Sequence, residues 1–245
     1  MGVKMVSVFL AGAGPGDPEL LTLKTARLLA TAEVVLHDSL VGPEILALIN
    51  PVAEIVDVGK RCGQASTAQA EICRLLVAYA QTGKLVVRLK GGDPVIFGRL
   101  TEEMEALRAV GVGFDVVPGV TAASAAAAGL SLSLTQRRIA RGVHIITGHG
   151  ADHGLPTHDW TALAQAGGTL AIYMGSKYLP GLVEKLLQAG LSEDVPAIAV
   201  ESASLPGMRV LRAGLATLPG VVLAARPRGP VLVLVGQAMA LETNH

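Results

Sequence analysis

Short apolar runs alternate with longer amphipathic stretches along most of the chain, and this alternation is typical of α/β proteins. Residues 6–12 and 33–37 are among the apolar runs, and they lack the polar alternation of a half-exposed strand. The stretch that starts at Thr67 has the helical period instead, and its apolar face consists of Ile72, Leu75, Leu76 and Tyr79. We therefore expect a largely parallel sheet with helices on both faces.

A polar and basic segment at residues 133–142 interrupts this pattern and marks the expected domain boundary. We expect an N-terminal α/β domain over residues 1–136, with a largely parallel sheet. A C-terminal α/β domain would then cover residues 137–245. Its last three apolar runs are compatible with antiparallel strands and hairpins, so a mixed sheet is expected there.

Composition narrows the class of protein. Of the 245 residues, 51% are hydrophobic and 16% are charged, which excludes a disordered chain. The formal net charge is zero and only 3% of residues are aromatic, so neither a basic surface nor stacking platforms for nucleic acid are expected. No targeting peptide is visible, and the apolar run at residues 120–134 is too short and polar for a membrane span. A cytoplasmic protein is expected.

A glycine-rich loop at residues 12–16 follows the first apolar run and precedes a helical stretch. Its G-x-G-x-G spacing is close to the G-x-G-x-x-G fingerprint of dinucleotide-binding proteins, and Asp38 lies where a ribose-binding acid would stand. Pro15 and Pro18 count against that interpretation, because proline donates no N–H group and here delays the start of the helix. An NAD-dependent oxidoreductase is therefore a weak alternative.

Two further loops of the same kind follow apolar runs. Residues 91–94 read Gly-Gly-Asp-Pro, and residues 117–121 read Val-Pro-Gly-Val-Thr. Ligands of open α/β sheets lie outside the carboxyl ends of the strands, so the three loops are expected to line one crevice. Since none of them carries a phosphate signature, an uncharged nucleoside is favoured over a dinucleotide.

At this point the sequence resembles a known family. The segments "AGAGPGDPELLTLKTARLL", "VLHDSLV", "GKRCGQASTAQAEI", "VVRLKGGDPVIFGR", "VVPGVTAASAAAAG" and "AIYMG" are together similar to the uroporphyrinogen-III C-methyltransferases of the tetrapyrrole methylase family. The resemblance runs from about Val6 to about Gly236. It implies two α/β domains with an S-adenosylmethionine cofactor in the cleft between them, a tetrapyrrole substrate, and usually a homodimer.

The resemblance also implies roles for particular positions. The cofactor contacts match Pro15, Gly91, Gly92, Asp93, Ile96, Thr121, Ala122, Met174 and, more loosely, Ala203. The positions for proton handling match Asp38 and Lys60, and Arg99 and Glu102 match positions for substrate handling. This chain departs from the usual family motifs at Leu100, Gln136 and Met208, which leaves the cofactor loops intact and affects substrate contacts.

A substrate rich in carboxylates requires local cations in a protein of zero net charge. The candidate cations are Lys60, Arg61, Arg99, Arg137, Arg138 and Arg141, since arginine binds carboxylates through two hydrogen bonds. His149, in "TGH", is a further candidate substrate contact. No metal site is expected, because His149, His153 and His158 lie in a loop without fixed spacing, and Cys62 and Cys73 are remote from them.

The reaction implied by the resemblance transfers two methyl groups to C2 and C7 of uroporphyrinogen III, giving precorrin-2 through precorrin-1. The pyrrole β-carbon is itself an electron-rich nucleophile, so the protein needs to align the reactants and supply a base. A methylase of a later corrin intermediate is the alternative within the family. A non-catalytic nucleoside-binding module is the alternative of another class.

Overall fold

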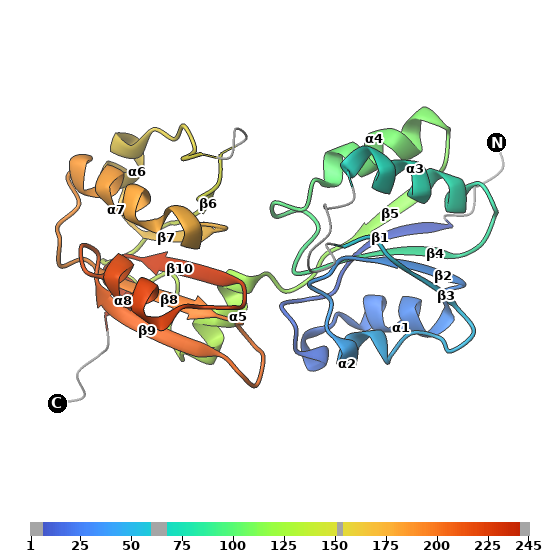
Figure 1. Ribbon diagram of the computed structural model, residues 1–245, viewed down its shortest axis with the longest axis horizontal. Coiled ribbons are helices and arrows are strands. Elements are labelled where there is room, and N and C mark those ends of the chain that lie inside the picture. The colour runs from blue at the N-terminus through green and yellow to red at the C-terminus, as the bar shows by residue number, and fades with distance from the viewer. Residues whose placement is uncertain (1–6, 60–67, 151–153, 241–245) are drawn as a thin grey trace. The chain divides into compact units, whose positions relative to one another are not determined.

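The computed structural model describes residues 7–59, 68–150 and 154–240, and the chain forms two compact units, Met1–Thr121 and Ala122–His245. Each unit contains a five-stranded sheet with helices packed on it (Figure 1). This arrangement confirms the α/β class expected from the alternating pattern. Within the described ranges no helix has the length and apolarity needed to cross a membrane.

The sheet of the first unit is parallel throughout. Its strands have the order β3-β2-β4-β1-β5 and are β1 (Val8–Gly12), β2 (Val34–His37), β3 (Glu54–Asp57), β4 (Val86–Lys90) and β5 (Phe114–Val117). All carboxyl ends therefore lie at one edge of the sheet, the edge at which α/β proteins bind ligands.

Helices cover both faces of this first sheet. The connecting elements are the 3₁₀ turn η1 (Pro18–Leu20) and the helices α1 (Leu23–Thr31), α2 (Pro43–Leu46), α3 (Gln69–Ala80) and α4 (Leu100–Ala109). On one face, Leu29 of α1 and Ile45 of α2 pack with Val87 and Leu89 of β4. On the other face α3 and α4 pack together over the sheet, with Leu107 in that core (Figure 1).

The sheet of the second unit is mixed and has the order β6-β7-β10-β8-β9. Only β6 and β7 pair in parallel, whereas β10 pairs antiparallel with β7 and β8, and β8 with β9. Its strands are β6 (Val143–Thr147), β7 (Thr169–Tyr173), β8 (Pro196–Glu201), β9 (Arg209–Gly214) and β10 (Val231–Val235). Its helices and turns are α5 (Ala122–Gly129), α6 (Trp160–Ala166), η2 (Ser176–Tyr178), α7 (Leu179–Gln188), α8 (Leu218–Ala225) and η3 (Gln237–Met239).

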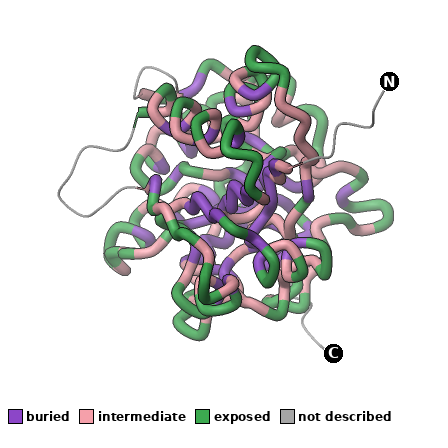
Figure 2. The backbone as a smooth tube through the Cα atoms, turned by 90° about the vertical axis from the view of Figure 1, so that its right-hand side faces the viewer, coloured by how far each residue is buried: buried purple, intermediate pink, exposed green. Residues whose placement is uncertain are grey.

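Helix α5 belongs to the second unit. Its Ala123 and Ala126 are buried in one hydrophobic cluster with Ile198 of β8 and with Leu232 and Leu234 of β10. The small alanine side chains let the helix lie close to the sheet. The expected boundary between residues 136 and 137 thus falls inside this unit, after α5, because the apolar helix is held by the second sheet. Figure 2 colours the backbone by burial and shows buried stretches alternating with exposed ones along the chain.

Candidate active site

Three glycines at the carboxyl ends of β1, β4 and β5 are in direct backbone contact. A Cβ atom on Gly12 would lie 2.7 Å from the Cα of Gly119 and 2.7 Å from the carbonyl oxygen of Gly92. A Cβ atom on Gly119 would lie only 2.3 Å from the same oxygen. Any larger residue would push the loops apart, so the sequence needs glycine at these positions. The three loops that the sequence analysis groups together therefore meet at their glycines.

The first two loops are also joined by hydrogen bonds. The N–H of Gly14 donates to the carbonyl oxygen of Gly92 at 3.1 Å, and the N–H of Gly92 donates to that of Gly14 at 2.7 Å. Ala13 donates to the carbonyl oxygen of Lys90 at 2.7 Å. Both Gly14 and Gly92 have φ near +70°, which is accessible to glycine without strain. The backbone of this edge is consequently fixed before any ligand binds.

The loop after β1 does not direct a helix N-terminus at its glycines. The carboxylate of Asp17 accepts from the N–H of Glu19 at 2.8 Å and caps the short turn η1, where Pro18 is the first residue. Helix α1 starts only at Leu23, capped by Thr22, whose hydroxyl oxygen accepts from the N–H of Thr25. The prolines thus separate the helix dipole from the glycines, which removes the pyrophosphate site of a dinucleotide-binding turn.

The loop after β4 is held in an uncommon conformation. The carboxylate of Asp93 accepts from the N–H of Val95 at 3.0 Å and shapes the turn that carries Ile96. Phe97 and Arg99 have φ of 51° and 52°, in the left-handed region that non-glycine residues rarely adopt. Backbone strain of this kind is concentrated at functional sites.

Arg99 and Glu102 form an exposed ion pair at the start of α4. Two parallel hydrogen bonds join them, Nε to Oε1 at 2.8 Å and Nη2 to Oε2 at 2.7 Å. Their side chains remain 57% and 46% exposed. An exposed pair contributes little to stability, so the guanidinium group is available to an anionic ligand at small cost.

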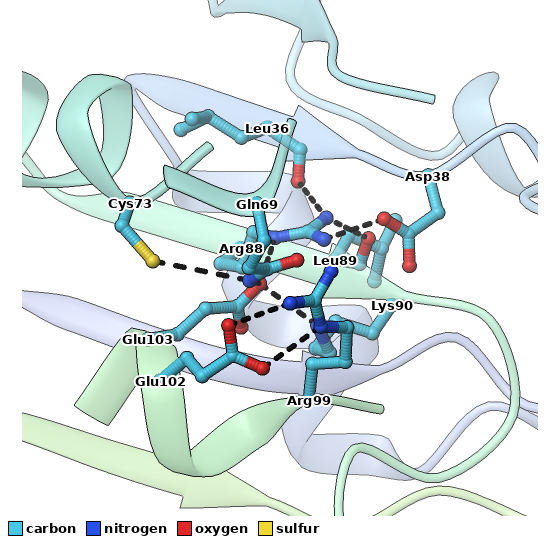
Figure 3. A network of polar contacts seen from close by, with 10 residues as sticks. All are labelled: Leu36, Asp38, Gln69, Cys73, Arg88, Leu89, Lys90, Arg99, Glu102 and Glu103. Atoms are coloured by element: carbon cyan, nitrogen blue, oxygen red, sulfur yellow. Dashed lines mark hydrogen bonds and ion pairs between the residues drawn. The ribbon is translucent and has the colours of Figure 1, made fainter. Parts of the chain in front are cut away.

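Charged side chains lie buried behind this edge, and we call Asp38, Arg88, Lys90 and Glu103 the buried charge cluster (Figure 3). Nη2 of Arg88 lies 2.5 Å from Oδ1 of Asp38, and its Nε lies 3.0 Å from Oε1 of Glu103. Nζ of Lys90 donates to the same Glu103 oxygen at 2.8 Å. Only Asp38, directly after β2, keeps appreciable exposure, at 29% of its side chain.

Burial sets the titration of Lys90. Desolvation lowers the pKa of its ammonium group, and the neighbouring positive charge of Arg88 lowers it further, while Glu103 and Asp38 act in the opposite direction. The carboxylates of Glu103 and Asp38 therefore offset part of the effect of burial on Lys90.

A thiol lies beside the same carboxylate. Gln69 of α3 donates weakly to Oε1 of Glu103 at 3.5 Å and lies 3.9 Å from the sulfur of Cys73 (Figure 3). Burial raises the pKa of the Cys73 thiol, and the charges of Glu103 and Glu102 raise it further. A thiol of this kind is a poor nucleophile at neutral pH.

The sequence analysis missed Arg88, Lys90 and Glu103 as members of a site. A signal was present, because Arg88 and Lys90 interrupt an otherwise apolar strand whose five residues are all buried. Charged residues are almost never fully buried unless they are paired. Their partners, Asp38 and Glu103, are distant in sequence, so only the fold reveals them.

In the second unit, two other loops meet at glycines. A Cβ atom on Gly148 would lie 2.4 Å from the Cα of Gly175, so the loops that carry His149 and Met174 touch. The ring centroid of His149 is 5.7 Å from that of Tyr178. The hydroxyl oxygen of Tyr173 accepts from the N–H of Ala123 at 2.9 Å, which ties the start of α5 to the end of β7.

Strained backbone marks the same edge of the second sheet. Met174 follows β7 with φ of 55°, and its side chain is half-exposed. Ser202 and Ser204, after β8, have φ of 54° and 71° and flank the buried Ala203. The candidate cofactor contacts thus divide between the units: Ala122, Met174 and Ala203 belong to the second, and the others belong to the first.

An open hollow of about 620 Å³, bordered by exposed arginines, is also found in the second unit, and we call it the basic cavity. It is lined by Thr135, Gln136, Arg137, Arg138, Ala140 and Arg141. Gln136 and Ala140 exchange backbone hydrogen bonds of 2.9 and 2.8 Å, which fold the segment back on itself and bring its three arginines to one hollow. The segment that the sequence suggested as a polar domain boundary is therefore a candidate binding site for anions.

Four candidate residues remain, Lys60, Arg61, His153 and His158. Lys60, Arg61 and His153 are outside the described residues. His158 contacts the carbonyl oxygen of Thr147 at 2.8 Å, so its imidazole ring supports the loop of His149. Among the residues that the structure describes, no group of three His, Cys, Asp or Glu side chains has the arrangement of a metal site.

Comparisons with known proteins identify the family of this chain. The family model for tetrapyrrole (corrin/porphyrin) methylases matches residues 7–219. A chloroplastic protein of Arabidopsis thaliana, the S-adenosyl-L-methionine-dependent uroporphyrinogen III methyltransferase, is 43% identical over 96% of this chain and 64% of its own length. The siroheme synthase of Tolumonas auensis is 46% identical over 96% of this chain and 49% of its own length. The chain thus spans about half to two thirds of these two relatives.

Solved structures give the same result. The uroporphyrin-III C-methyltransferase of Thermus thermophilus, solved with S-adenosyl homocysteine, superposes with a TM-score of 0.80 at 42% identity, covering 94% of this chain and 97% of that one. A cobalt precorrin-4 methyltransferase superposes with a TM-score of 0.85 at 31% identity, covering 96% of both chains. The resemblance seen in the sequence motifs is confirmed, and this chain belongs to the tetrapyrrole (corrin/porphyrin) methylases.

Proposed function

We propose that this chain is an S-adenosylmethionine-dependent C-methyltransferase that methylates uroporphyrinogen III at C2 and C7. The product is precorrin-2, formed through precorrin-1, with release of S-adenosylhomocysteine. The observation that carries the proposal is the contact of Gly12, Gly92 and Gly119, which joins three ligand loops without building a phosphate site. The names of the relatives in Arabidopsis and Thermus support the choice of substrate and cofactor.

The side chains and backbone at this edge suit such a cofactor. The loops offer backbone carbonyl groups and the carboxylate of Asp93, and in the second unit the half-exposed side chain of Met174. These groups match an uncharged nucleoside attached to a positively charged sulfonium. S-adenosylmethionine supplies an electrophilic methyl group when bound. We assign its binding to Pro15, Gly91, Gly92, Asp93, Ile96, Thr121, Ala122, Met174 and Ala203.

Alignment is the main task of the protein in this reaction. The attacking pyrrole carbon needs no protein nucleophile, and holding the reactants in line contributes up to ~7–11 kcal/mol in favourable cases. Because the ring carbon gains a methyl group, the macrocycle must then release a proton. We assign the proton acceptor to Asp38, which is partly exposed and held by Arg88, and we assign proton handling also to Lys60.

The remaining assignments concern the substrate. Arg99 and Glu102 form the exposed pair beside the strained loop, and we assign them to substrate handling together with Arg61 and His149. The basic cavity at residues 135–141 supports a substrate with several carboxylates, because three arginines converge there in a chain of zero net charge. We further propose that the protein is a cytoplasmic homodimer and that its product enters sirohaem, haem d1 or cobalamin synthesis.

The decisive experiment supplies the substrate directly. The purified protein is incubated with S-adenosylmethionine and enzymatically made uroporphyrinogen III under anaerobic conditions, and the products are followed by mass and absorbance. We expect a product heavier by two methyl groups, with a singly methylated intermediate at early times. If the cofactor binds and no methylated product forms, the proposed reaction is wrong.

The same purified protein distinguishes the proposed reaction from two alternatives. A methylase of a later corrin intermediate, favoured by the superposition on the precorrin-4 enzyme, would leave uroporphyrinogen III unchanged and methylate that intermediate. A nucleoside-binding module would bind S-adenosylhomocysteine and methylate neither. Calorimetry with S-adenosylhomocysteine and NAD tests the cofactor, and tight binding of NAD would contradict our interpretation of residues 12–16.

A further inference from the structure

Glu103 of α4 is the anionic centre of the buried charge cluster, since both Arg88 and Lys90 pair with it. Its side chain is fully buried, and Oε1 accepts from Nε of Arg88 and from Nζ of Lys90, with Gln69 more distant (Figure 3). Its other oxygen, Oε2, is buried and has no hydrogen-bond partner among the described residues. Glu103 therefore binds two cations through one oxygen.

Stability alone does not account for this arrangement. Moving a carboxylate and two cations out of water costs several kcal/mol per ion, and apolar replacements of buried ion pairs are often neutral or stabilising. A buried oxygen without a partner adds to that cost. The cluster therefore calls for a function that depends on the position of its charges.

Arg88 connects Glu103 to Asp38. Its Nε donates to Glu103, its Nη1 donates to the carbonyl oxygens of Leu36 and Leu89 at 3.5 and 3.2 Å, and its Nη2 donates to Asp38. A guanidinium group is planar, so fixing its Nε and Nη1 also fixes the direction of Nη2. Glu103 and two backbone carbonyls thus determine where Arg88 meets the carboxylate of Asp38.

Lys90 makes the carboxylate of Glu103 indispensable for this geometry. Lys90 and Arg88 are two residues apart on β4 and point to the same side of the strand, where both are buried. Without an anion between them the two cations would repel each other in a medium of low polarity. Glu103 is the shared counter-ion that allows Arg88 to stay in place.

We propose that Glu103 is a positioning residue for methyl transfer: it holds Arg88 so that Nη2 fixes the carboxylate of Asp38 at the carboxyl end of β2. The proposal rests on the proposed function, in which Asp38 accepts the proton. Glu103 acts through Arg88 and contacts neither cofactor nor substrate. Its substitution should therefore slow turnover without weakening binding.

The first test is Glu103→Gln, which keeps the shape of the side chain and removes its charge. We expect kcat to fall by about 10- to 100-fold, the cost of a misplaced catalytic group. KM for uroporphyrinogen III and the Kd of S-adenosylhomocysteine should stay within twofold of the wild type. Glu105→Gln is the matched control. It removes the same charge from an exposed position on the same helix. Wild-type kcat in folded Glu103→Gln would overturn the proposal.

A second variant covers the case in which Glu103→Gln does not fold. The double substitution Gln69→Glu/Glu103→Gln moves the carboxylate to a neighbouring, half-buried position on α3 and leaves the net charge of the two positions unchanged. We expect this variant to fold and to remain at least 10-fold slower, because the carboxylate no longer faces Nε of Arg88. Recovery of wild-type kcat would show that only the charge is needed, which would also overturn the proposal.

A spectroscopic readout separates this inference from the proposed function. The Nε–H signal of Arg88, assigned by ¹H–¹⁵N NMR, should exchange slowly with solvent in the wild type and at least tenfold faster in Glu103→Gln. If the wild type does not methylate uroporphyrinogen III and this difference is present, the substrate is wrong and the positioning role stands. If the Nε–H of Arg88 exchanged equally fast in the two proteins, Glu103 would not position Arg88, whatever the substrate is.

Discussion

Gly119 lies so close to Gly92 that a Cβ atom on Gly119 would stand 2.3 Å from the carbonyl oxygen of Gly92. We predict that Gly119→Ala forces these loops apart and destabilises the first unit by about 1–3 kcal/mol, the usual cost of overpacking. The Kd of S-adenosylhomocysteine should rise at least tenfold in calorimetry. Gly113→Ala is the control, because a Cβ atom there meets nothing within 4 Å. Equal behaviour of the two variants would contradict the contact.

Because Arg99 and Glu102 form an exposed pair, we predict that replacing Arg99 lowers turnover without lowering the stability of the fold. Arg99→Ala should lower kcat/KM at least 100-fold, since it removes a cation assigned to the substrate, and should leave the Kd of S-adenosylhomocysteine within about twofold. Arg74→Ala is a matched control, because Arg74 forms the same type of exposed pair with Glu71 on α3. Steady-state kinetics of both variants test this prediction. Unchanged turnover of Arg99→Ala would show that Arg99 does not act in the site.

The basic cavity predicts a role in binding. The double substitution Arg138→Ala/Arg141→Ala should raise KM for uroporphyrinogen III by about 10-fold or more, because each carboxylate contact with arginine is charge-assisted. The kcat should change by less than threefold, since no bond is made or broken there. Arg27→Ala, on the exposed side of α1, should leave KM unchanged. A fall in kcat at constant KM would contradict a pure binding role.

We predict that Glu201 makes the stability of the second unit depend on pH. Its carboxylate accepts from the N–H groups of Gly229 and Arg228 and from Arg209, and these hydrogen bonds lower its pKa below the ordinary value of 4.5. A group whose pKa is lowered by folding contributes stability above its unfolded pKa, and this contribution is lost as the pH falls through the folded pKa. Glu201→Gln should therefore lower the melting temperature at pH 7 by about 4–8 °C.

The comparison across pH completes that test. The difference in melting temperature between wild type and Glu201→Gln should shrink below pH 4.5 and nearly vanish where Glu201 is protonated in both states. Glu184→Gln, on the exposed side of α7, should show little difference at any pH. A difference that stays constant from pH 7 to pH 3 would show that the charge of Glu201 is not responsible.

Cys73 reports on the charge of Glu103. Its raised pKa predicts slow alkylation by iodoacetamide at pH 8, with a rate that increases as the pH rises, because only the thiolate reacts. Removing the charge of Glu103 lowers the thiol pKa, so Glu103→Gln should react faster at pH 8. The experiment uses a Cys62→Ser background, so that a single thiol is present. A slower reaction in Glu103→Gln would contradict the predicted sign.

The α/β class, the glycine-rich loops and the family could all be predicted from local patterns along the chain. Apolar runs between amphipathic helices are a local pattern, and glycine and proline at residues 12–18 act on the backbone through their own stereochemistry. The departure from a dinucleotide-binding turn could therefore be predicted from Pro15 and Pro18. The structure bears this out, because η1 separates the glycines from helix α1.

The grouping of the buried charges could not be predicted in this way, because it depends on how distant segments pack. Asp38 and Arg88 are 50 residues apart, and Arg88 and Glu103 are 15 apart, so no spacing rule joins them. Their contact depends on the parallel pairing of β2 with β4 and on the packing of α4 over the sheet. The same holds for α5, whose alanines suit any close-packed surface and whose place on the second sheet follows from the partners that bury it. Long-range packing, which brings distant residues into a medium of low polarity, therefore assembled the buried charge cluster.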